Sequence, residues 1–453
     1  MIKPSLENLL SGLREFWRSV FRSPDPRYVL IRLIVIGVFI RFCVMPFFCH
    51  PDFLSEYRRI NLQFQEANLF PGARFVVTLI EMVNYTIAYP FLGDGNSMFF
   101  MSPDAIKPAG HLDFFIFVSH PAVFRTLWLL KMSYLVFDML CAWIIFRYTL
   151  GLYGLRKAKL ATAVWIFNPI TIFSFYVFGR YESIALFFFL LSILWMREKR
   201  LLLGCMAFAL CLWSREIFAL VLPMFLIAVW IDTGQSWLRR GIGTLIVITV
   251  LGFVSNALPH ALGFTSVLDA AYSNVAAQDQ LRSIIAFNIK WYYPIIVLYT
   301  LLCFYLITAK EPLQYRLPRV IAGFFLSFFV FSIHSVHYVA WLIPSLCIFL
   351  PVSKHFLLGI VGFVITWIAY WLLATDLGVF TAWLAAPVST HLLNLPNLPI
   401  WLGEQLPKFT SLRVGELVGI FKSMQIACLI FFAILIFRNP SLDSGNKDIS
   451  TDA

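Results

Sequence analysis

The feature that most constrains this chain is a series of apolar runs that recurs from Tyr28 almost to the C-terminus. Each run is about 18–22 residues long, which is enough for a helix to cross the hydrocarbon core of a bilayer. Only 13% of the 453 residues are charged, whereas a soluble globular domain carries roughly 25%. The sequence therefore excludes a soluble protein and predicts an all-α polytopic membrane protein with about 12 transmembrane helices.

The net charge of +11 comes from basic residues that lie mostly in short loops between the apolar runs. The positive-inside rule gives this distribution to cytoplasmic loops, and it lacks the clustered basic patch of a groove-binding protein. A nucleic-acid partner is therefore not expected. The eight cysteines are scattered, without the Cys-x-x-Cys or Cys/His spacing of a zinc or redox centre.

Placing the basic loops in the cytoplasm divides the chain into three parts. Residues 1–27 are predicted to form a cytoplasmic amphipathic segment, because five basic residues alternate there with leucine, phenylalanine and tryptophan. Residues 28–438 form the predicted transmembrane domain, and residues 439–453 form a polar cytoplasmic tail. The compact loops favour a bacterial inner membrane, and both termini are predicted to be cytoplasmic.

The first outer loop, at about residues 49–121, is much longer than the other loops. Connections longer than about 15 residues usually carry function or structure of their own. Within it, Leu69–Phe91 mixes apolar and polar residues at helical spacing, which predicts an amphipathic helix on the outer leaflet. The loop opens with Cys49–Arg59, where Asp52 lies four residues beyond Phe48, the last residue of the first apolar run.

Charged and titratable side chains gather on the predicted outer side of the membrane. They lie in the first outer loop and at the tips of three predicted hairpins, and they comprise Asp52, Arg180, Glu182, Arg215, Glu216, His334 and His337. Charge at or below a membrane surface is costly and marks a functional site by default. The alternative is that each is an ordinary interfacial residue in water. The convergence of the whole set on one face favours a site.

Two ionisable residues lie deeper, inside the predicted second span (Val123–Phe146). Lys131 and Asp138 are seven residues apart, so they share a helix face but are separated by about 10 Å, too far for a direct ion pair. Lys131 is nearer the outer side and is a candidate partner for a phosphate group. Asp138 is expected to be structural, with a backbone or hydroxyl partner. For Arg32 and Arg41 in the first span, snorkelling and ion pairing both stay open.

Four stretches of the chain carry a family resemblance. They read CHPDFLSEY after the first span, LLKMSYLVFDML in the second, FNPITIFSFYVFGRYESIALFFFLL across the third and fourth, and SREIFALVLP followed later by HSVHYVAWLIP. Together they resemble the GT-C superfamily of integral-membrane glycosyltransferases. The nearest group is the bacterial polyprenol-phosphate-mannose-type transferases and the related GPI mannosyltransferases. Relatives usually have Gln and Asp where Arg180 and Glu182 stand, and often Lys at the position of Arg215.

The resemblance implies an inverting transfer of a sugar, with mannose favoured, from a polyprenyl-phosphate-linked donor to an acceptor hydroxyl on a glycan, glycolipid or other molecule. In this superfamily an acidic residue of the first outer loop is the catalytic base, and Asp52 matches that position. The leaving phosphate needs positive charge. Candidate substrate-binding residues are Lys131, Arg180, Glu182, Arg215, His337 and Tyr338, with Glu56 and Arg58 as second-line candidates for binding or bracing. No cofactor and no metal are expected, because members with such donors are metal-independent.

Two rival functions compete with sugar transfer. A transporter or lipid flippase without transfer chemistry would have inverted repeats and broken helices in both halves. Pro169, Pro223 and Pro344 do interrupt predicted spans, but the sequence contains no convincing internal repeat. A structural membrane subunit would not need the large charged first loop. Membrane lipids are expected neighbours under every reading.

Overall fold

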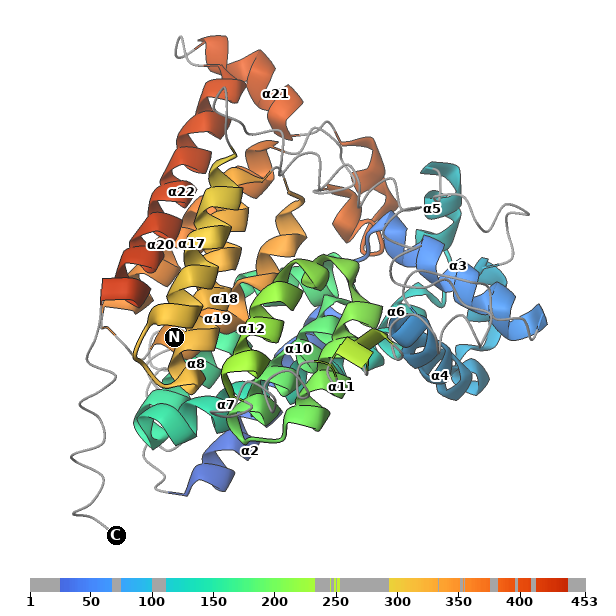
Figure 1. Ribbon diagram of the computed structural model, residues 1–453. Coiled ribbons are helices and arrows are strands. Elements are labelled where there is room, and N and C mark those ends of the chain that lie inside the picture. The colour runs from blue at the N-terminus through green and yellow to red at the C-terminus, as the bar shows by residue number, and fades with distance from the viewer. Residues whose placement is uncertain are drawn as a thin grey trace, which may run out of the picture.

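In the computed structural model, the described residues are 25–66, 75–99, 111–232, 293–332, 334–350, 355–374, 382–395, 398–408 and 413–438, with 245, 248–249, 251–252 and 353. These residues form helices and short helical turns, and no strand occurs among them (Figure 1). The predicted all-helical fold class is therefore confirmed for this part of the chain. The predicted tail at 439–453, residues 1–24 of the N-terminal segment and most of the predicted seventh span (241–258) lie outside it.

The α-helices follow the predicted apolar runs closely. In chain order they are α2 (Pro26–Val44), α3 (Pro51–Glu66), α4 (Phe75–Leu92), α5 (His111–Val118), α6 (Val123–Leu130), α7 (Met132–Tyr153), α8 (Leu155–Phe167), α9 (Pro169–Ile172), α10 (Glu182–Arg197), α11 (Leu201–Ser214), α12 (Leu222–Asp232), α17 (Pro294–Thr308), α18 (Leu313–Phe331), α19 (Ile343–Phe349), α20 (His355–Ala374), α21 (Leu398–Gln405) and α22 (Val414–Arg438).

Shorter turns of other helical types connect them. These are the 3-10 turns η1 (Gly93–Phe99), η3 (Glu216–Val221), η5 (Val336–Trp341), η8 (Ala382–Ala385), η9 (Thr390–Asn394) and η10 (Leu406–Lys408), and the π-helix η2 (Phe173–Val177). A π-helical turn inside an α-helical segment is uncommon and often lies at a functional site. Here η2 leads directly into residues 179–183, the tip of the predicted hairpin that carries Arg180 and Glu182.

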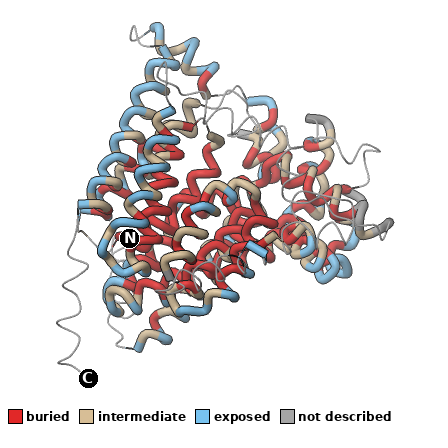
Figure 2. Tube along the Cα trace, in the orientation of Figure 1, coloured by how far each residue is buried: buried red, intermediate tan, exposed pale blue. Residues whose placement is uncertain are grey.

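The helices pack around α7, which lies between α8 and α10. Helix α10 packs in turn against α11, and α20 packs against α22 on one flank of the molecule, beside α17 (Figure 1). Helices α3, α4, α5 and α6 gather on the opposite flank (Figure 1). Buried residues concentrate in the middle of the molecule, whereas α20 and α22 expose much of their outer faces (Figure 2). The core therefore centres on α7, α8 and α10.

Helix α4 turns Glu81 and Asn84 toward the protein and exposes an apolar face. Glu81 is fully buried and accepts a hydrogen bond from the Tyr134 hydroxyl at 2.6 Å. The Asn84 amide donates to the Leu130 carbonyl at 2.9 Å. Its exposed face carries Leu79, Val83, Ile87 and Phe91, which are between 45% and 66% exposed. Such an arrangement is stable when lipid rather than water surrounds the helix.

Within the described part of the chain, four helical segments are long and apolar enough to cross a membrane. They are Phe75–Asn96, Val123–Tyr153, His355–Ala374 and Val414–Arg438, and the bent segment from Leu155 to Val177 makes a fifth if it counts as one span. This supports a helical membrane protein, while the prediction of about 12 spans stays a prediction. Helix α4 differs from the surface helix expected at Leu69–Phe91, because its polar residues turn inward rather than toward an interface.

A buried charge network joins α2, α7, α8 and η2. Arg41 and Asp138 are both fully buried, and Arg41 Nε lies 2.9 Å from Asp138 Oδ2. The same carboxylate accepts hydrogen bonds from Trp165 Nε1 and the Tyr176 hydroxyl, each at 2.8 Å. Asp138 is therefore structural as expected, with Arg41 as an additional partner. Of the two roles left open for Arg41, ion pairing is the one observed.

Candidate functional site

The entry to α3 is held by Lys131, which lies between α6 and α7. Its Nζ donates to the carbonyl oxygens of Met45 at 3.0 Å, Tyr176 at 2.8 Å and also Phe48. An ammonium group has only three N–H donors, so these carbonyls use all of them. The expectation that Lys131 meets a phosphate is therefore wrong for this arrangement. Lys131 instead ties the end of α2 and the end of η2 to one point.

The turn between η2 and α10 brings Arg180 up to α3. Gly179 has φ +78°, and a Cβ atom there would lie 3.2 Å from the ring of Phe53, so glycine suits this position twice over. The Arg180 N–H donates to the Ser174 carbonyl at 3.1 Å, and Ser174 Oγ donates to the His337 carbonyl at 2.9 Å. The π-helix thus fixes Arg180 and His337 relative to each other.

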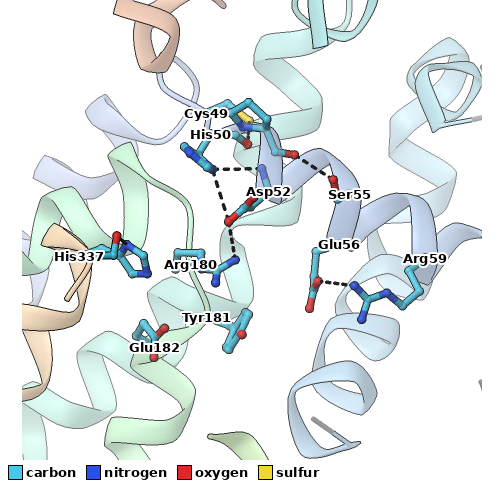
Figure 3. A network of polar contacts seen from close by, with 12 residues as sticks. Cys49, His50, Asp52, Ser55, Glu56, Arg59, Arg180, Tyr181, Glu182 and His337 are labelled. Carbon is cyan, nitrogen blue, oxygen red and sulfur yellow. Dashed lines mark hydrogen bonds and ion pairs between the residues drawn. The ribbon is translucent and has the colours of Figure 1, made fainter. Parts of the chain in front are cut away.

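Asp52 and Arg180 meet at the start of α3. Arg180 Nη1 donates to Asp52 Oδ2 at 3.1 Å (Figure 3). The Asp52 side chain is 46% exposed, whereas that of Arg180 is only 11% exposed. Asp52 lies in the first turn of α3, where the helix dipole favours negative charge. The Asp52 carboxylate is thus held by the buried Arg180 guanidinium, while its exposed side can be reached by ligands.

His50 packs beside this pair and was not among the predicted site residues. Its Nδ1 accepts a hydrogen bond from the Asp52 backbone N–H at 3.1 Å and lies 3.6 Å from Asp52 Oδ2 (Figure 3). The rings of His50, Phe178 and His337 form a stack, with Phe178 in the middle and centroid distances of 3.9 Å and 4.3 Å. The stack joins the residue before α3 to η5 through the η2–α10 turn.

A second charged pair involves Glu182, two residues beyond Arg180. Arg215 Nη2 is 3.5 Å from Glu182 Oε1, and both side chains are almost fully buried. Arg215 Nη1 also donates to the Tyr181 hydroxyl at 3.1 Å, and Trp341 Nε1 donates to Glu182 Oε2 at 2.9 Å. The Arg215 guanidinium lies 5.0 Å from the centre of the Tyr338 ring, within cation–π range. Predicted residues from three separate stretches therefore meet in one place.

Glu56 and Arg58 lie further along α3 and do not join this cluster. Glu56 pairs with Arg59 at 3.1 Å (Figure 3). Arg58 is buried and pairs with Asp113 of α5 at 3.1 Å. Of the two roles that the sequence left open for Arg58, bracing is the one seen here, because the pair ties α3 to α5.

Three nitrogen atoms in the cluster are buried without a hydrogen-bond partner among the described residues. They are Nε of Arg180, Nε of Arg215 and Nε2 of His337. Buried polar groups in native proteins nearly always have a partner, and leaving one without costs about 1–3 kcal/mol. These atoms therefore give the cluster spare hydrogen-bonding capacity, and the two guanidinium groups give it the chemistry to hold an anion.

Burial lowers the pKa of His50 from 6.5 to about 4, with the neighbouring Arg180 acting in the same direction and Asp52 opposing both. The unfolded chain therefore binds a proton between pH 6.5 and 4 that the folded chain does not, so stability falls as the pH falls through this window. At about 1.4 kcal/mol per pH unit, the difference corresponds to about 3 kcal/mol. We expect His50→Asn, which keeps a hydrogen-bond acceptor, to flatten the dependence of unfolding free energy on pH in this window.

Denaturant unfolding of the purified protein at several pH values measures this. Replacing the exposed His355 with Asn is the matched control, and its profile should follow that of the wild type. A His50→Asn profile as steep as that of the wild type would show that His50 does not contribute to the loss at low pH.

The described residues contain no group of three or more His, Cys, Asp or Glu side chains placed to hold a metal ion. The expectation that no metal takes part stays a prediction. His50, Phe178 and Tyr181 were not among the predicted site residues, although all three lie inside the stretches that carry the family resemblance. His50 stands two residues before Asp52, and that spacing was the available signal. No model of a known protein family matches the chain, and no curated protein is significantly similar to it in sequence.

Proposed function

We propose that this chain is an integral-membrane glycosyltransferase. It moves a sugar, with mannose favoured, from a polyprenyl-phosphate-linked donor to an acceptor hydroxyl on the outer, periplasmic or luminal side of the membrane. Asp52 is the catalytic base, and Arg180 and Arg215 bind the phosphate of the donor. His337 and Tyr338 complete the wall of the site. The proposal rests on the family resemblance of the sequence and on the geometry of the Asp52 cluster.

The single observation that carries it is the contact of Asp52 with Arg180. A half-exposed carboxylate 3.1 Å from a nearly buried guanidinium places a proton acceptor beside an anion-binding group. Inverting transfer from a phosphate-linked sugar needs both groups, one for the attacking hydroxyl and one for the leaving phosphate. Among the described residues Arg180 donates to Asp52 through Nη1, and its buried Nε–H has no hydrogen-bond partner there.

The proposed step is a single displacement at the anomeric carbon. The acceptor oxygen forms a bond to that carbon while its proton passes to the Asp52 carboxylate. The bond between the anomeric carbon and the donor phosphate oxygen breaks, and its electron pair leaves on the polyprenyl phosphate. Arg180 and Arg215 stabilise this charge, and a guanidinium suits two oxygens of one phosphate. The configuration at the anomeric carbon inverts.

One observation favours the transporter alternative. The segment from Leu155 to Val177 is bent by 41° at Asn168, where α8 ends and α9 begins with Pro169. Discontinuous helices near a binding site are typical of secondary transporters. The same bend also serves a transferase, because it carries η2 and the Arg180 turn to α3. The two functions differ in whether the sugar–phosphate bond breaks.

An assay with both readouts separates the two functions. The purified full chain is incubated with radiolabelled polyprenyl-phosphate-mannose and a membrane acceptor extract, and transfer is followed as release of polyprenyl phosphate. In parallel, proteoliposomes report movement of a fluorescent polyprenyl-phosphate lipid between leaflets. We expect transfer from the lipid donor and none from a nucleotide sugar. Lipid movement between leaflets without bond cleavage for any polyprenyl-phosphate sugar tested would instead establish the transporter.

A further inference from the structure

A pocket lies at the far end of α10, the helix that begins in the candidate site. It has a volume of about 190 Å³ and lies between α7, α10 and α18, with Tyr148, Arg197, Lys199 and Leu317 among its lining residues. Helix α10 begins at Glu182 in the candidate site and ends at Arg197 in this pocket, about 22 Å away at 1.5 Å per residue. The two sites are therefore well separated.

The pocket lies near the ends of two helices, α7 and α10, and α7 is part of a candidate membrane span. Tyr148 stands five residues before the end of the candidate span Val123–Tyr153, and Arg197 is the last residue of α10. The ends of membrane-spanning helices lie at the boundary between hydrocarbon and headgroups. Most of the lining residues are apolar, with Ile193, Met196 and Leu317 among them. A ligand there meets an apolar wall on one side and cations on the other.

Positive charge around the pocket exceeds negative charge. Arg197 and Lys199 line it, and Arg147 and Arg200 flank it by pairing with Glu198, at 2.6 Å and 3.7 Å. Among these described residues the cations outnumber the carboxylate of Glu198. Both flanking arginines are at least half exposed, so their pairs with Glu198 are weak.

Arg197 is held in place without a carboxylate. Its Nη1 donates to the Tyr148 carbonyl at 2.8 Å, and its guanidinium lies 4.9 Å from the centre of the Tyr148 ring. A Cβ atom at Gly151 would collide with Arg197 Nη2, so the glycine makes room for the guanidinium. No carboxylate of the described residues lies within ion-pair distance of Arg197. Its charge is thus positioned but not neutralised there.

Lys199 has an unusual backbone for its residue type. Its φ of +62° is left-handed, and it is the one non-glycine residue with positive φ in the part of the chain described. Glycine or asparagine usually takes this position after a helix, because a side chain there is strained. A strained residue that lines a cavity points to a functional demand on its side chain. For Lys199 that functional demand is a positive charge at the pocket.

We infer that this pocket binds the anionic phosphate headgroup of a membrane phospholipid. Arg197 and Lys199 contact the phosphate, and an acyl chain follows the apolar wall of the pocket. Basic pockets between helices at a membrane surface hold anionic lipids in this way. The simpler alternative is that these cations only fix the orientation of the chain in the membrane. That alternative needs charge near the surface but neither the cavity nor the left-handed lysine.

The test compares the full chain in nanodiscs of pure phosphatidylcholine with nanodiscs that also contain phosphatidylglycerol. We expect phosphatidylglycerol to raise the Tm of the wild type, and Arg197→Gln and Lys199→Gly to lose most of that rise. Arg200→Gln removes the same charge outside the pocket and should keep the rise. Lys199→Gly should also have a higher Tm than the wild type in pure phosphatidylcholine, because glycine relieves the strain. The Lys199→Gly variant therefore still tests the inference if Arg197→Gln fails to fold.

Two results would overturn the inference. Phosphatidylglycerol could raise the Tm equally in the wild type and the three variants, or Arg200→Gln and Lys199→Gly could lose the rise equally. Either result would leave diffuse surface charge as the cause of the rise. Soluble glycerol phosphate added to phosphatidylcholine nanodiscs separates the lipid from a free anion. If it reproduced the full rise, the ligand would be a water-soluble phosphate and the lipid assignment would be wrong.

Discussion

Replacing Asp52 with Asn is expected to lower the rate of sugar transfer by about 10²- to 10⁴-fold, the range for loss of a general base. Asparagine keeps the shape of the side chain and an oxygen that accepts from Arg180 Nη1, so the Asp52–Arg180 contact can be retained. It has no basicity to take the acceptor proton. The loss should therefore fall on kcat, with little change in the affinity for the polyprenyl-phosphate donor.

Single-turnover transfer from radiolabelled donor measures this effect. Glu404→Gln is the matched control, since it removes an exposed carboxylate on α21, outside the candidate site. It should transfer at the wild-type rate. If Asp52→Asn did so as well, Asp52 would not be the base. Loss of donor binding in Asp52→Asn would instead assign Asp52 to holding Arg180.

Replacing Arg215 with Ala is expected to lower the free energy of unfolding by about 3–5 kcal/mol, the range for breaking a buried ion pair from one side. The change leaves the fully buried Glu182 carboxylate without its cation, while the hydrogen bond from Trp341 Nε1 to Glu182 Oε2 remains. Donor binding should fall too, because Arg215 is one of the two proposed phosphate ligands. Stability and binding must therefore be measured separately.

A second variant separates the two effects. Combining Arg215→Leu with Glu182→Gln removes both charges, and the glutamine oxygen can still accept from Trp341 Nε1. We expect the double variant to regain most of the lost stability, measured by unfolding in mixed micelles, while transfer stays low. Recovery of transfer together with stability would show that Arg215 only supports the fold. A single variant as stable as the wild type would mean that the Arg215–Glu182 pair is energetically neutral.

The sequence predicted the helical class and most helix positions because apolar length alone determines them. The sequence also predicted one site for Asp52, Arg180, Glu182, Arg215, His337 and Tyr338. The reason is that hairpin tips on the same side of a membrane lie at similar depth. The prediction for Lys131 differs from the structure. A cation inside a predicted span was expected to contact a phosphate group. Carbonyls at the end of a helix satisfy an ammonium equally well, and no pattern in a sequence reveals which ones will be near.

The inward-facing polar side of α4 was also beyond the sequence pattern. Polar residues at helical spacing predict an amphipathic helix but do not say whether its polar face meets water or other helices. Glu81 and Asn84 face α6 and α7, and only packing decides that. The ring stack of His50, Phe178 and His337 is similar, because its members are more than 100 residues apart along the chain.

Lys131 also constrains the order in which the protein is made. Its acceptors are Met45 and Phe48, synthesised before it, and Tyr176, which leaves the ribosome 45 residues after it. During insertion, the Lys131 ammonium therefore lacks its third acceptor, the Tyr176 carbonyl, until η2 has entered the bilayer. A nascent chain that stops after α7 retains an incompletely satisfied charge. Completion of the Asp52–Arg180 centre and satisfaction of that charge are thus a single late event in biogenesis.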